Sequence, residues 1–429
     1  MKKVGILTLG CRVNQYESDA LSELITERGF EVCPFDSECD LYIINTCTVT
    51  AESDSKSRKA IRRAFREREK SGARVAVIGC FPQGATEKCE ELEKADFVSG
   101  NLNKREVVDR IEEIFNGEKL DLRKSLVGAE YENLSINSPK YVKAYVKIED
   151  GCNNFCSYCY VPFVRGRVRS RAEDDILREV SVLKEKGYKE IILTGIETSS
   201  YGEDFNKAEP LVSLVERIQK EVHIERLRFG SLHPSFFTEE RVERLALAGV
   251  MPHFHLSVQS GASNVLSLMK RNYDSDCLYK ATELIRKAFP DANLSCDMIC
   301  GFPEERESDF EESLAFIKNA KILHTHIFPY SKRELTAAAK MKQVHNAEIY
   351  RRSRVMQRVA DEVHKEVFND NVGKEYNVLV EFFKSGKAQG YTENFINLSF
   401  DNNNFKKGDI VKIKVAPDMD KNLQNILEK

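Results

Sequence analysis

One stretch organises the chain of 429 residues: Gly151-Cys152-Asn153-Asn154-Phe155-Cys156-Ser157-Tyr158-Cys159. Its three cysteines follow the pattern C-x3-C-x2-C, and thiolates are the usual protein ligands of iron–sulfur clusters. A cluster of four irons that is held by only three protein sulfurs keeps one iron open to another molecule. A structural zinc ion needs a closed set of four ligands, and no fourth Cys or His lies close in the sequence. The stretch therefore favours a 4Fe–4S cluster at Cys152, Cys156 and Cys159 over zinc.

The spacing of these cysteines resembles the signature of the radical S-adenosylmethionine (SAM) enzymes. In those enzymes, the amino acid end of SAM chelates the open iron. On this resemblance the three cysteines are catalytic, and we expect Tyr158, directly before the last of them, to contribute to cofactor binding.

Length, composition and net charge limit the possible classes of protein. A chain of 429 residues suggests two to four domains. The net charge of −3 does not indicate a nucleic-acid binder, so any RNA contact must come from local patches. No apolar run is long enough to span a membrane, and the start lacks a signal-peptide pattern, so we expect a cytoplasmic protein without membrane contact. Disulfides are not expected among the 12 cysteines of such a chain.

The region around the cysteine loop alternates strand and helix patterns. The strand candidates are 142–148, 190–194, 226–230, 253–258, 294–299 and 323–328. Helix patterns follow all but the last, which predicts an α/β fold with parallel strands. Six such strands are fewer than the eight of a closed TIM barrel, so we expect a partial, open (β/α)6 barrel. The cysteine loop follows the first strand and would lie at the carboxyl face, where barrel active sites are built.

Other loops at the same face are polar and contain glycine. They include Gly195, Glu197, Ser257 and Gln259. We expect Glu197 to pair with the ammonium group of SAM, and Ser257 and Gln259 to bind its carboxylate or ribose. An arginine run beside the cysteine loop has two open interpretations. In one, it offsets the charge of the cluster or binds phosphate; in the other, it is a solvated turn. Its members are Arg165, Arg167, Arg169 and Arg171.

The first part of the chain predicts a second site of three thiols. Short apolar runs at 4–9, 41–44 and 75–78 read as buried parallel strands. Each run ends at a cysteine, namely Cys11, Cys47 and Cys80. Ligands in open parallel sheets lie outside the carboxyl ends of the strands, so the three thiols should converge and again leave one position open. The alternative is three buried structural cysteines.

Near the end of the chain, apolar and polar residues alternate with a period of two. Strand candidates at 376–381, 388–392, 395–399 and 410–415 predict a small antiparallel β-barrel. Base-stacking and phosphate-binding residue types occur there, as in proteins that bind single-stranded RNA. They are Lys384, Lys387, Tyr391, Asn394 and Phe395, and the alternative is a generic β-module.

The whole chain resembles the methylthiotransferases, a family of radical SAM enzymes. Segments 10–18, 45–50 and 326–331 resemble the branch that modifies N6-threonylcarbamoyladenosine (t6A) in tRNA. The resemblance implies a methylthiotransferase domain with an auxiliary cluster at 1–138, a radical SAM domain with a linking helix at 139–370, and a TRAM-like RNA-binding domain at 371–429. Glu334-Leu335-Thr336 stands where the family usually has Pro-Gly-Thr, and Glu197 where many members carry His or Asn.

The resemblance also implies the reaction and its partners. One SAM methylates a sulfur on the N-terminal cluster, and another is cleaved to a 5′-deoxyadenosyl radical that activates C2 of the adenine. The product is the 2-methylthio derivative of t6A, beside the anticodon. Two 4Fe–4S clusters, SAM, a tRNA anticodon stem-loop, a reductant such as flavodoxin or ferredoxin, and a monomeric state are expected. The alternatives are methylthiolation of isopentenyladenosine in tRNA or of a ribosomal protein aspartate, and a non-catalytic iron–sulfur RNA-binding protein.

Overall fold

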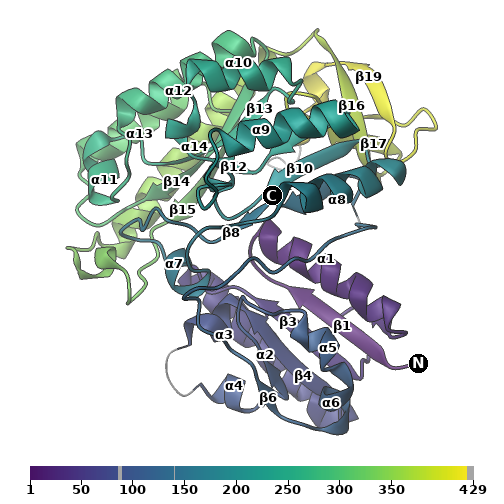
Figure 1. Cartoon of the computed structure of the whole chain (residues 1–429). Coiled ribbons are helices and arrows are strands. Elements are labelled where there is room, and N and C mark those ends of the chain that lie inside the picture. The colour runs from purple at the N-terminus through teal and green to yellow at the C-terminus, as the bar shows by residue number, and fades with distance from the viewer. Residues whose placement is uncertain (86–88, 140, 423–429) are drawn as a thin grey trace.

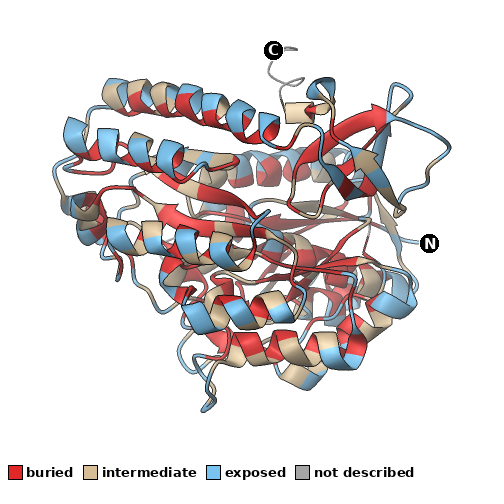
Figure 2. Cartoon of the chain, turned by 90° about the horizontal axis from the view of Figure 1, so that it is seen from above, coloured by how far each residue is buried: buried red, intermediate tan, exposed pale blue. Residues whose placement is uncertain are grey.

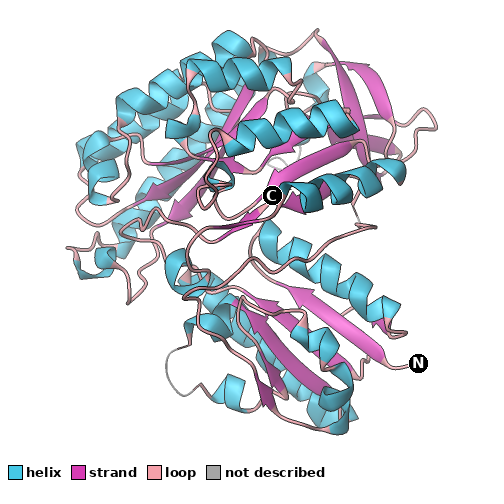
Figure 3. Ribbon diagram, in the orientation of Figure 1, coloured by secondary structure: helices cyan, strands magenta, loops and turns pink. Residues whose placement is uncertain are grey.

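The computed structural model of the chain describes residues 1–85, 89–139 and 141–422. Figure 1 shows an N-terminal α/β layer beside a larger α/β unit, and a sheet from the end of the chain that lies against this unit. Helices and strands alternate through the first two parts, whereas strands dominate the last part (Figure 3).

The N-terminal part is built on a six-stranded parallel sheet in the order β2-β1-β3-β4-β5-β6. Its strands are β1 (Lys3–Thr8), β2 (Glu31–Cys33), β3 (Leu41–Thr46), β4 (Arg74–Gly79), β5 (Phe97–Val98) and β6 (Leu120–Asp121). Its helices are α1 (Arg12–Glu27), α2 (Ala51–Ser71), α3 (Cys80–Gly84), α4 (Glu90–Glu93), α5 (Glu106–Asp109) and α6 (Ile111–Asn116).

Both faces of this sheet are covered. Ile43 of β3 packs with Ile25 of α1 on one face, while Ile44 packs with Ile61 of α2 on the other. Strands that are buried on both faces read as continuous Val, Ile and Leu runs, which is why the sequence located β1, β3 and β4 within two residues of their observed ends.

The central part contains two parallel sheets, β11-β10-β7 and β12-β13-β14-β15. Its parallel strands are β7 (Ala144–Lys147), β10 (Glu190–Thr194), β11 (Arg226–Phe229), β12 (Ser231–Leu232), β13 (His253–Gln259), β14 (Asn293–Cys300) and β15 (His324–Pro329). A short antiparallel pair joins β8 (Glu149–Asp150) to β9 (Arg169–Ser170). The helices are α7 (Val161–Val164), α8 (Glu173–Glu185), α9 (Pro210–Arg217), α10 (Glu239–Leu247), α11 (Ser263–Leu268), α12 (Ser275–Ala288), α13 (Glu307–Asn319) and α14 (Asn346–Asn369).

The six strands predicted for this part therefore exist, are parallel, and lie within two residues of the predicted bounds. Only Gly230 separates β11 from β12, so one extended segment contributes a strand to each sheet. The α/β class with parallel strands is confirmed.

The last part is an antiparallel sheet in the order β18-β17-β16-β19. Its strands are β16 (Glu375–Lys384), β17 (Lys387–Tyr391), β18 (Asn397–Asp401) and β19 (Ile410–Lys414). Val378 and Val380 of β16 belong to the same hydrophobic cluster as Leu294 of β14 and Phe368 of α14. The C-terminal sheet and the central part thus share one core, and Figure 2 shows the strands largely buried beneath exposed helix surfaces.

Within the described ranges, none of the helices combines the length and the apolar character that a membrane crossing requires.

Candidate active site

The cysteine loop lies between β8 and α7, where the backbone needs residues that tolerate unusual conformations. Gly151 has a φ of 87°, and a Cβ at this position would collide with the carbonyl oxygen of Arg167. The amide of Cys152 donates to the carbonyl of Gly166 at 3.0 Å, and that of Cys159 to the carbonyl of Cys156 at 3.0 Å. The second bond closes a turn between Cys156 and Cys159, and the first joins Cys152 to the segment after α7.

A cation lies beside this turn. Nη1 of Arg271 lies 3.1 Å from Sγ of Cys156, and its Nη2 donates to the carbonyl of Ser257 at 2.8 Å. The guanidinium thus fixes the sulfur of Cys156 relative to the end of β13. The sequence analysis missed Arg271, because nothing in the sequence links it to a cysteine that precedes it by 115 residues.

Two of the predicted cofactor-binding residues lie in the polar surroundings of this loop. The Glu197 amide donates to Oε1 of Glu149 at 2.7 Å, and its carboxylate accepts from Ser199 at 2.7 Å. Burial raises the pKa of Glu197, and hydrogen bonds from Ser199 and Ser257 partly offset this effect. The structure thus brings Glu197 and Ser257 together.

Gly195, Gln259 and Tyr158 are placed differently. A Cβ on Gly195 would collide with Oε1 of Glu149, so only glycine fits there. Gln259 ends β13 with a φ of 68°. Tyr158 packs edge-on against Phe302, with ring centroids 6.2 Å apart, in a small hydrophobic cluster. Contact of these three residues with SAM stays a prediction.

The N-terminal thiols lie at the carboxyl ends of three adjacent strands. Cys11 follows β1, Cys47 follows β3, and Cys80 follows β4. Gly10 has a φ of 96°, and a Cβ there would lie 2.7 Å from Cβ of Cys47. Burial raises the pKa of Cys47, and the charges of Cys80 and Cys11 add to this shift, as expected for thiols that face one another. Nδ2 of Asn101 donates to Sγ of Cys80 at 3.2 Å.

A buried ionic network connects the two cysteine trios. Nη1 of Arg165 lies 2.9 Å from Oε1 of Glu17 on α1 and 2.9 Å from Oδ2 of Asp150, which precedes the cysteine loop. Lys147 contacts the same two carboxylates at 2.7 Å each, and Lys104 also pairs with Glu17. Burial opposes ionisation of Glu17, but the cations outweigh it and lower its pKa well below the usual range.

This network decides between the two interpretations of the arginine run. Arg165 and Arg171 are buried, and Arg171 pairs with Glu179. The prediction of a solvated turn is therefore wrong for both, and neither is open to phosphate. A signal for Glu17 was present in the sequence, since it interrupts the apolar stripe of α1 between Val13 and Leu21.

The C-terminal residues predicted to stack on RNA bases contact one another and the central part of the chain. Phe395 stacks on His253 of β13 at a centroid distance of 4.1 Å and on Tyr391 at 4.5 Å. Asn394 is buried, and its carbonyl accepts from the side chain of Asn293 at 2.9 Å. The predicted RNA contact of Asn394 is therefore wrong, because this side chain is buried between the C-terminal sheet and the central part. Contact of RNA with Lys384, Lys387, Tyr391 and Phe395 stays a prediction.

The donor set suits iron–sulfur clusters and a polar cofactor. Each trio offers three thiols with a donor group beside one sulfur, from Arg271 or Asn101. Oε2 of Glu149 is buried without a hydrogen-bond partner among the described residues. Its partner oxygen accepts from the Glu197 amide, so an unpaired polar atom lies beside the predicted SAM residues.

Comparisons with known proteins agree with this chemistry. The Radical SAM superfamily matches residues 146–317, and the family described as Uncharacterized protein family UPF0004 matches residues 3–100. The threonylcarbamoyladenosine tRNA methylthiotransferase MtaB of Aquifex aeolicus is 35% identical over 404 residues, which cover 91% of this chain and 98% of that protein. The MtaB protein of Bacillus subtilis is 34% identical over 97% of this chain and 94% of its own length.

One further relative and one solved structure are also similar to the chain. The tRNA-2-methylthio-N(6)-dimethylallyladenosine synthase of Carboxydothermus hydrogenoformans is 32% identical over 97% of each chain. Among solved structures, the radical SAM methyltransferase TsrM of Kitasatospora setae, with cobalamin and a 4Fe–4S cluster bound, is similar at a TM-score of 0.58 and 17% identity. That match covers 79% of this chain and 74% of TsrM, and it supports the fold alone.

Proposed function

The chain belongs to the radical SAM methylthiotransferase family, and we propose that it converts t6A beside the anticodon of tRNA to its 2-methylthio derivative. It is an enzyme that uses SAM and 4Fe–4S clusters, as its family does. Relatives named for t6A methylthiolation match at 32–35% identity over nearly the full chain, and they support this substrate.

We assign one cluster to each cysteine trio. Cys152, Cys156 and Cys159 would hold the cluster that binds SAM, and Cys11, Cys47 and Cys80 would hold the auxiliary cluster. When bound, the clusters and SAM supply the radical and sulfur chemistry, which side-chain acid–base groups cannot supply at an aromatic C–H bond. The thiols of each trio lie close enough to raise one another's pKa, which supports the assignment.

The protein's own residues orient these groups. Arg271 holds the sulfur of Cys156 and, through its second nitrogen, the end of β13. Asn101 donates to Cys80 on the other side. Glu197 and Ser257 present oxygen atoms beside the first trio, which suits the ammonium and hydroxyl groups of SAM, and Gly195 keeps the backbone free of a side chain there.

The network around Arg165 is the observation that carries the proposal. Arg165 contacts Glu17, six residues after Cys11, and Asp150, two residues before Cys152. All three residues are buried, so the contact fixes the first helix of one part against the cysteine loop of the other. A reaction that needs a radical source and a sulfur source at one substrate atom requires such fixed geometry.

The finer organisation follows the same proposal. The domains would span 1–138, 139–370 and 371–429, with the central strands curved into a partial (β/α)6 barrel and a TRAM-like module at the end. We assign the tRNA anticodon stem-loop as substrate and flavodoxin or ferredoxin as the class of reductant. The enzyme would act as a monomer in the cytoplasm, where tRNA is available.

Mass spectrometry of nucleosides tests the substrate. The reconstituted enzyme is incubated with SAM, reductant and one of two stem-loop RNAs, which differ only in carrying t6A or isopentenyladenosine. We expect a methylthio product from the t6A RNA. A product only from the isopentenyl RNA would instead indicate the activity for which the Carboxydothermus hydrogenoformans relative is named. No product from either RNA would contradict the proposal.

Two matched variants accompany this assay. Serine replacements of the Cys152 trio should abolish formation of 5′-deoxyadenosine. Serine replacements of the Cys11 trio should spare that formation and stop methylthiolation. Loss of both activities in both variants would remove the proposed division of roles.

A further inference from the structure

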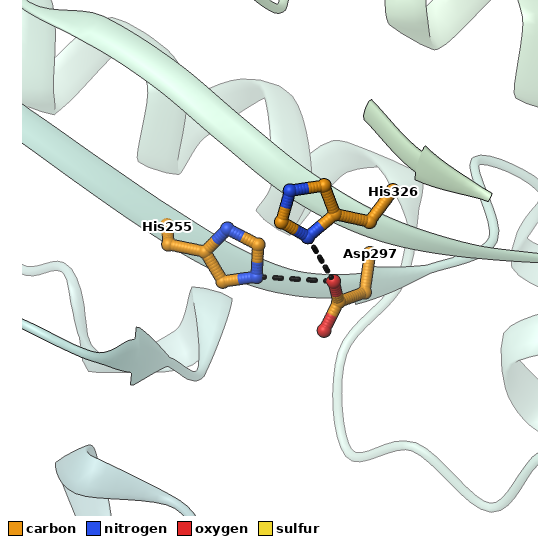
Figure 4. A group of neighbouring side chains, drawn as sticks. All are labelled: His255, Asp297 and His326. Carbon is orange, nitrogen blue, oxygen red and sulfur yellow. Dashed lines mark hydrogen bonds and ion pairs between the residues drawn. The ribbon is translucent and has the colours of Figure 1, made fainter. Parts of the chain in front are cut away.

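Three polar side chains outside the cluster sites meet on adjacent strands. They are His255 of β13, Asp297 of β14 and His326 of β15, and their nearest ligand-type atoms all lie within 4.8 Å of one another. Figure 4 shows both imidazole rings directed at the carboxylate of Asp297. These three residues belong to neither cysteine trio, so they form a separate group.

The trio lies on the face of the strands opposite the helices. Leu256 of β13 and Cys296 and Met298 of β14 are fully buried in the core, and side chains along a strand alternate between its two faces. His255 therefore shares its face with Ser257, about 7 Å further along the strand. The carbonyl of Ser257 accepts from Arg271, which contacts Cys156. This face therefore leads directly to the SAM-binding loop.

The hydrogen bonds define one outward-facing nitrogen. Oδ1 of Asp297 lies 3.2 Å from Nε2 of His255 and 3.2 Å from Nδ1 of His326. Nδ1 of His255 bonds Ser295 at 2.8 Å, so both ring nitrogens of His255 are occupied. Within the described part of the chain, Nε2 of His326 has no partner, and the His326 side chain is 59% exposed. Asp297 thus orients His326 with Nε2 towards the open side.

The charge of Asp297 is also fixed by these contacts. Burial opposes its ionisation, but the hydrogen bonds from His255 and His326 outweigh burial and lower its pKa. An ionised carboxylate behind an imidazole stabilises the protonated ring, as an aspartate does behind a catalytic histidine. Nε2 of His326 would share a proton with a bound anionic group while Nδ1 stays bonded to Asp297.

The strand that carries His326 is open on one side and leads towards the auxiliary site. β15 is an edge strand of its sheet, and Phe328, two residues beyond His326 on the same face, is 44% exposed. The segment after β15 reaches the Cys47 loop, because Ser331 accepts from the amide of Ala51 at 2.9 Å. The same strand thus runs from His326 to the neighbourhood of the auxiliary site.

We infer that His326 is the specificity-determining residue that binds the carboxylate of the threonylcarbamoyl group through Nε2. This inference rests on the proposed function, since t6A carries a carboxylate on its N6 substituent. An isopentenyl group has no polar atom and would leave the His326–Asp297 pair without a partner. A site that hydrogen-bonds a polar group of the substrate discriminates against an analogue that lacks this group.

Variants at His326 separate recognition from folding. His326→Asn keeps an amide nitrogen near the position of Nδ1, so the bond to Asp297 is retained while Nε2 is lost. His223→Asn is the matched control, because His223 is exposed and has a φ of 59°, which asparagine tolerates. Thermal midpoint and iron content, measured in each variant, establish that the comparison concerns folded protein. His326→Ala, which removes both ring nitrogens, serves as a second variant if His326→Asn does not fold.

The assay compares stem-loop RNAs that carry t6A or the methyl ester of its carboxylate. For the wild type, we expect kcat/KM to fall about tenfold to a hundredfold with the ester, the range for a lost hydrogen bond to a charged group. His326→Asn should show the lower value with both RNAs, and His223→Asn should behave as the wild type. A variant that still discriminates as the wild type does would overturn the inference.

The remaining outcomes are also decisive. A wild type that accepts both RNAs equally would overturn the role of His326 and leave the proposed function intact. A wild type that methylthiolates neither of them but acts on isopentenyladenosine RNA would instead overturn the proposed function. A stoichiometric metal other than iron, present in the wild type and lost in His326→Asn, would assign the trio to metal binding and overturn the inference.

Discussion

Glu17 is buried in the ionic network and faces three cations. We expect Glu17→Ala to lower the free energy of unfolding by about 3–5 kcal/mol, the range for removing one partner of a buried ion pair. Urea unfolding monitored by circular dichroism measures the change. The control is Glu27→Ala, an exposed position on the same helix, where a change of about 0.5 kcal/mol or less is expected. Equal effects of the two variants would show that the network does not stabilise the fold.

For single residues, the sequence predicts which side chains can bind metal better than it predicts which other residues they contact. The cysteines could be identified because their spacing and their places after apolar runs are local features. Arg165 was left open because its partner Glu17 is 148 residues away, and only the folded chain brings them together. His255, Asp297 and His326 alternate with apolar residues, which predicts strands. The register that brings the three together comes from strand pairing.

The loop between β17 and β18 closes the interface between the C-terminal sheet and the central part. We expect Phe395→Ala to cost about 2–4 kcal/mol, since it removes a packed aromatic ring that contacts His253 and Tyr391. Phe383→Ala, at a ring that is 39% exposed, is the control and should have little effect on stability. Thermal unfolding and limited proteolysis of the C-terminal sheet measure both. If Phe395 instead stacked on RNA bases, its loss would weaken RNA binding and leave stability unchanged.

Helix α14 is joined to the end of the described chain by His364. Its Nδ1 lies 2.9 Å from the carbonyl of Leu323 and its Nε2 lies 2.8 Å from Oδ2 of Asp420, so two acceptors face the ring. Burial lowers the pKa of His364, but the bonds to Asp420 and Leu323 outweigh burial and raise it. The protonated ring, with two N–H donors, suits both acceptors.

Because folding raises the pKa of His364, its contribution to stability depends on pH. The stabilisation by His364 is fully present below its unfolded pKa of about 6.5 and is lost as the pH rises through the raised folded pKa. The difference in melting temperature between the wild type and His364→Gln should therefore be larger at pH 6 than at pH 9. A difference that is the same at both pH values, or larger at pH 9, would contradict the assignment. The exposed variant His223→Gln is the control.

The elements themselves were predicted well where burial controls the pattern. The nine predicted parallel strands of the first two parts lie within two residues of their observed ends, because apolar runs mark strands that are covered on both faces. The short strands β2, β5, β6 and β12 were not predicted. The role of the 391–395 loop was not predictable, since aromatic and amide side chains suit RNA and a protein interface equally. Its partners lie on strands more than 90 residues earlier in the chain, such as Asn293 and His253.

For the whole molecule, the arrangement explains why one chain carries both trios. The N-terminal part has its own two cores, whereas the central part and the C-terminal sheet share one. The buried network around Arg165 joins these bodies and holds α1 beside the cysteine loop. Two cluster sites on separate bodies can thus face a common substrate with fixed geometry.

Iron analysis after anaerobic reconstitution tests these two sites most directly. The wild type should bind about eight irons per chain, since each 4Fe–4S cluster contributes four. Serine replacement of Cys152, Cys156 and Cys159, or of Cys11, Cys47 and Cys80, should leave about four irons in each case. A wild type with about four irons, or a triple variant that keeps all of its iron, would contradict the account of two separate three-thiolate sites.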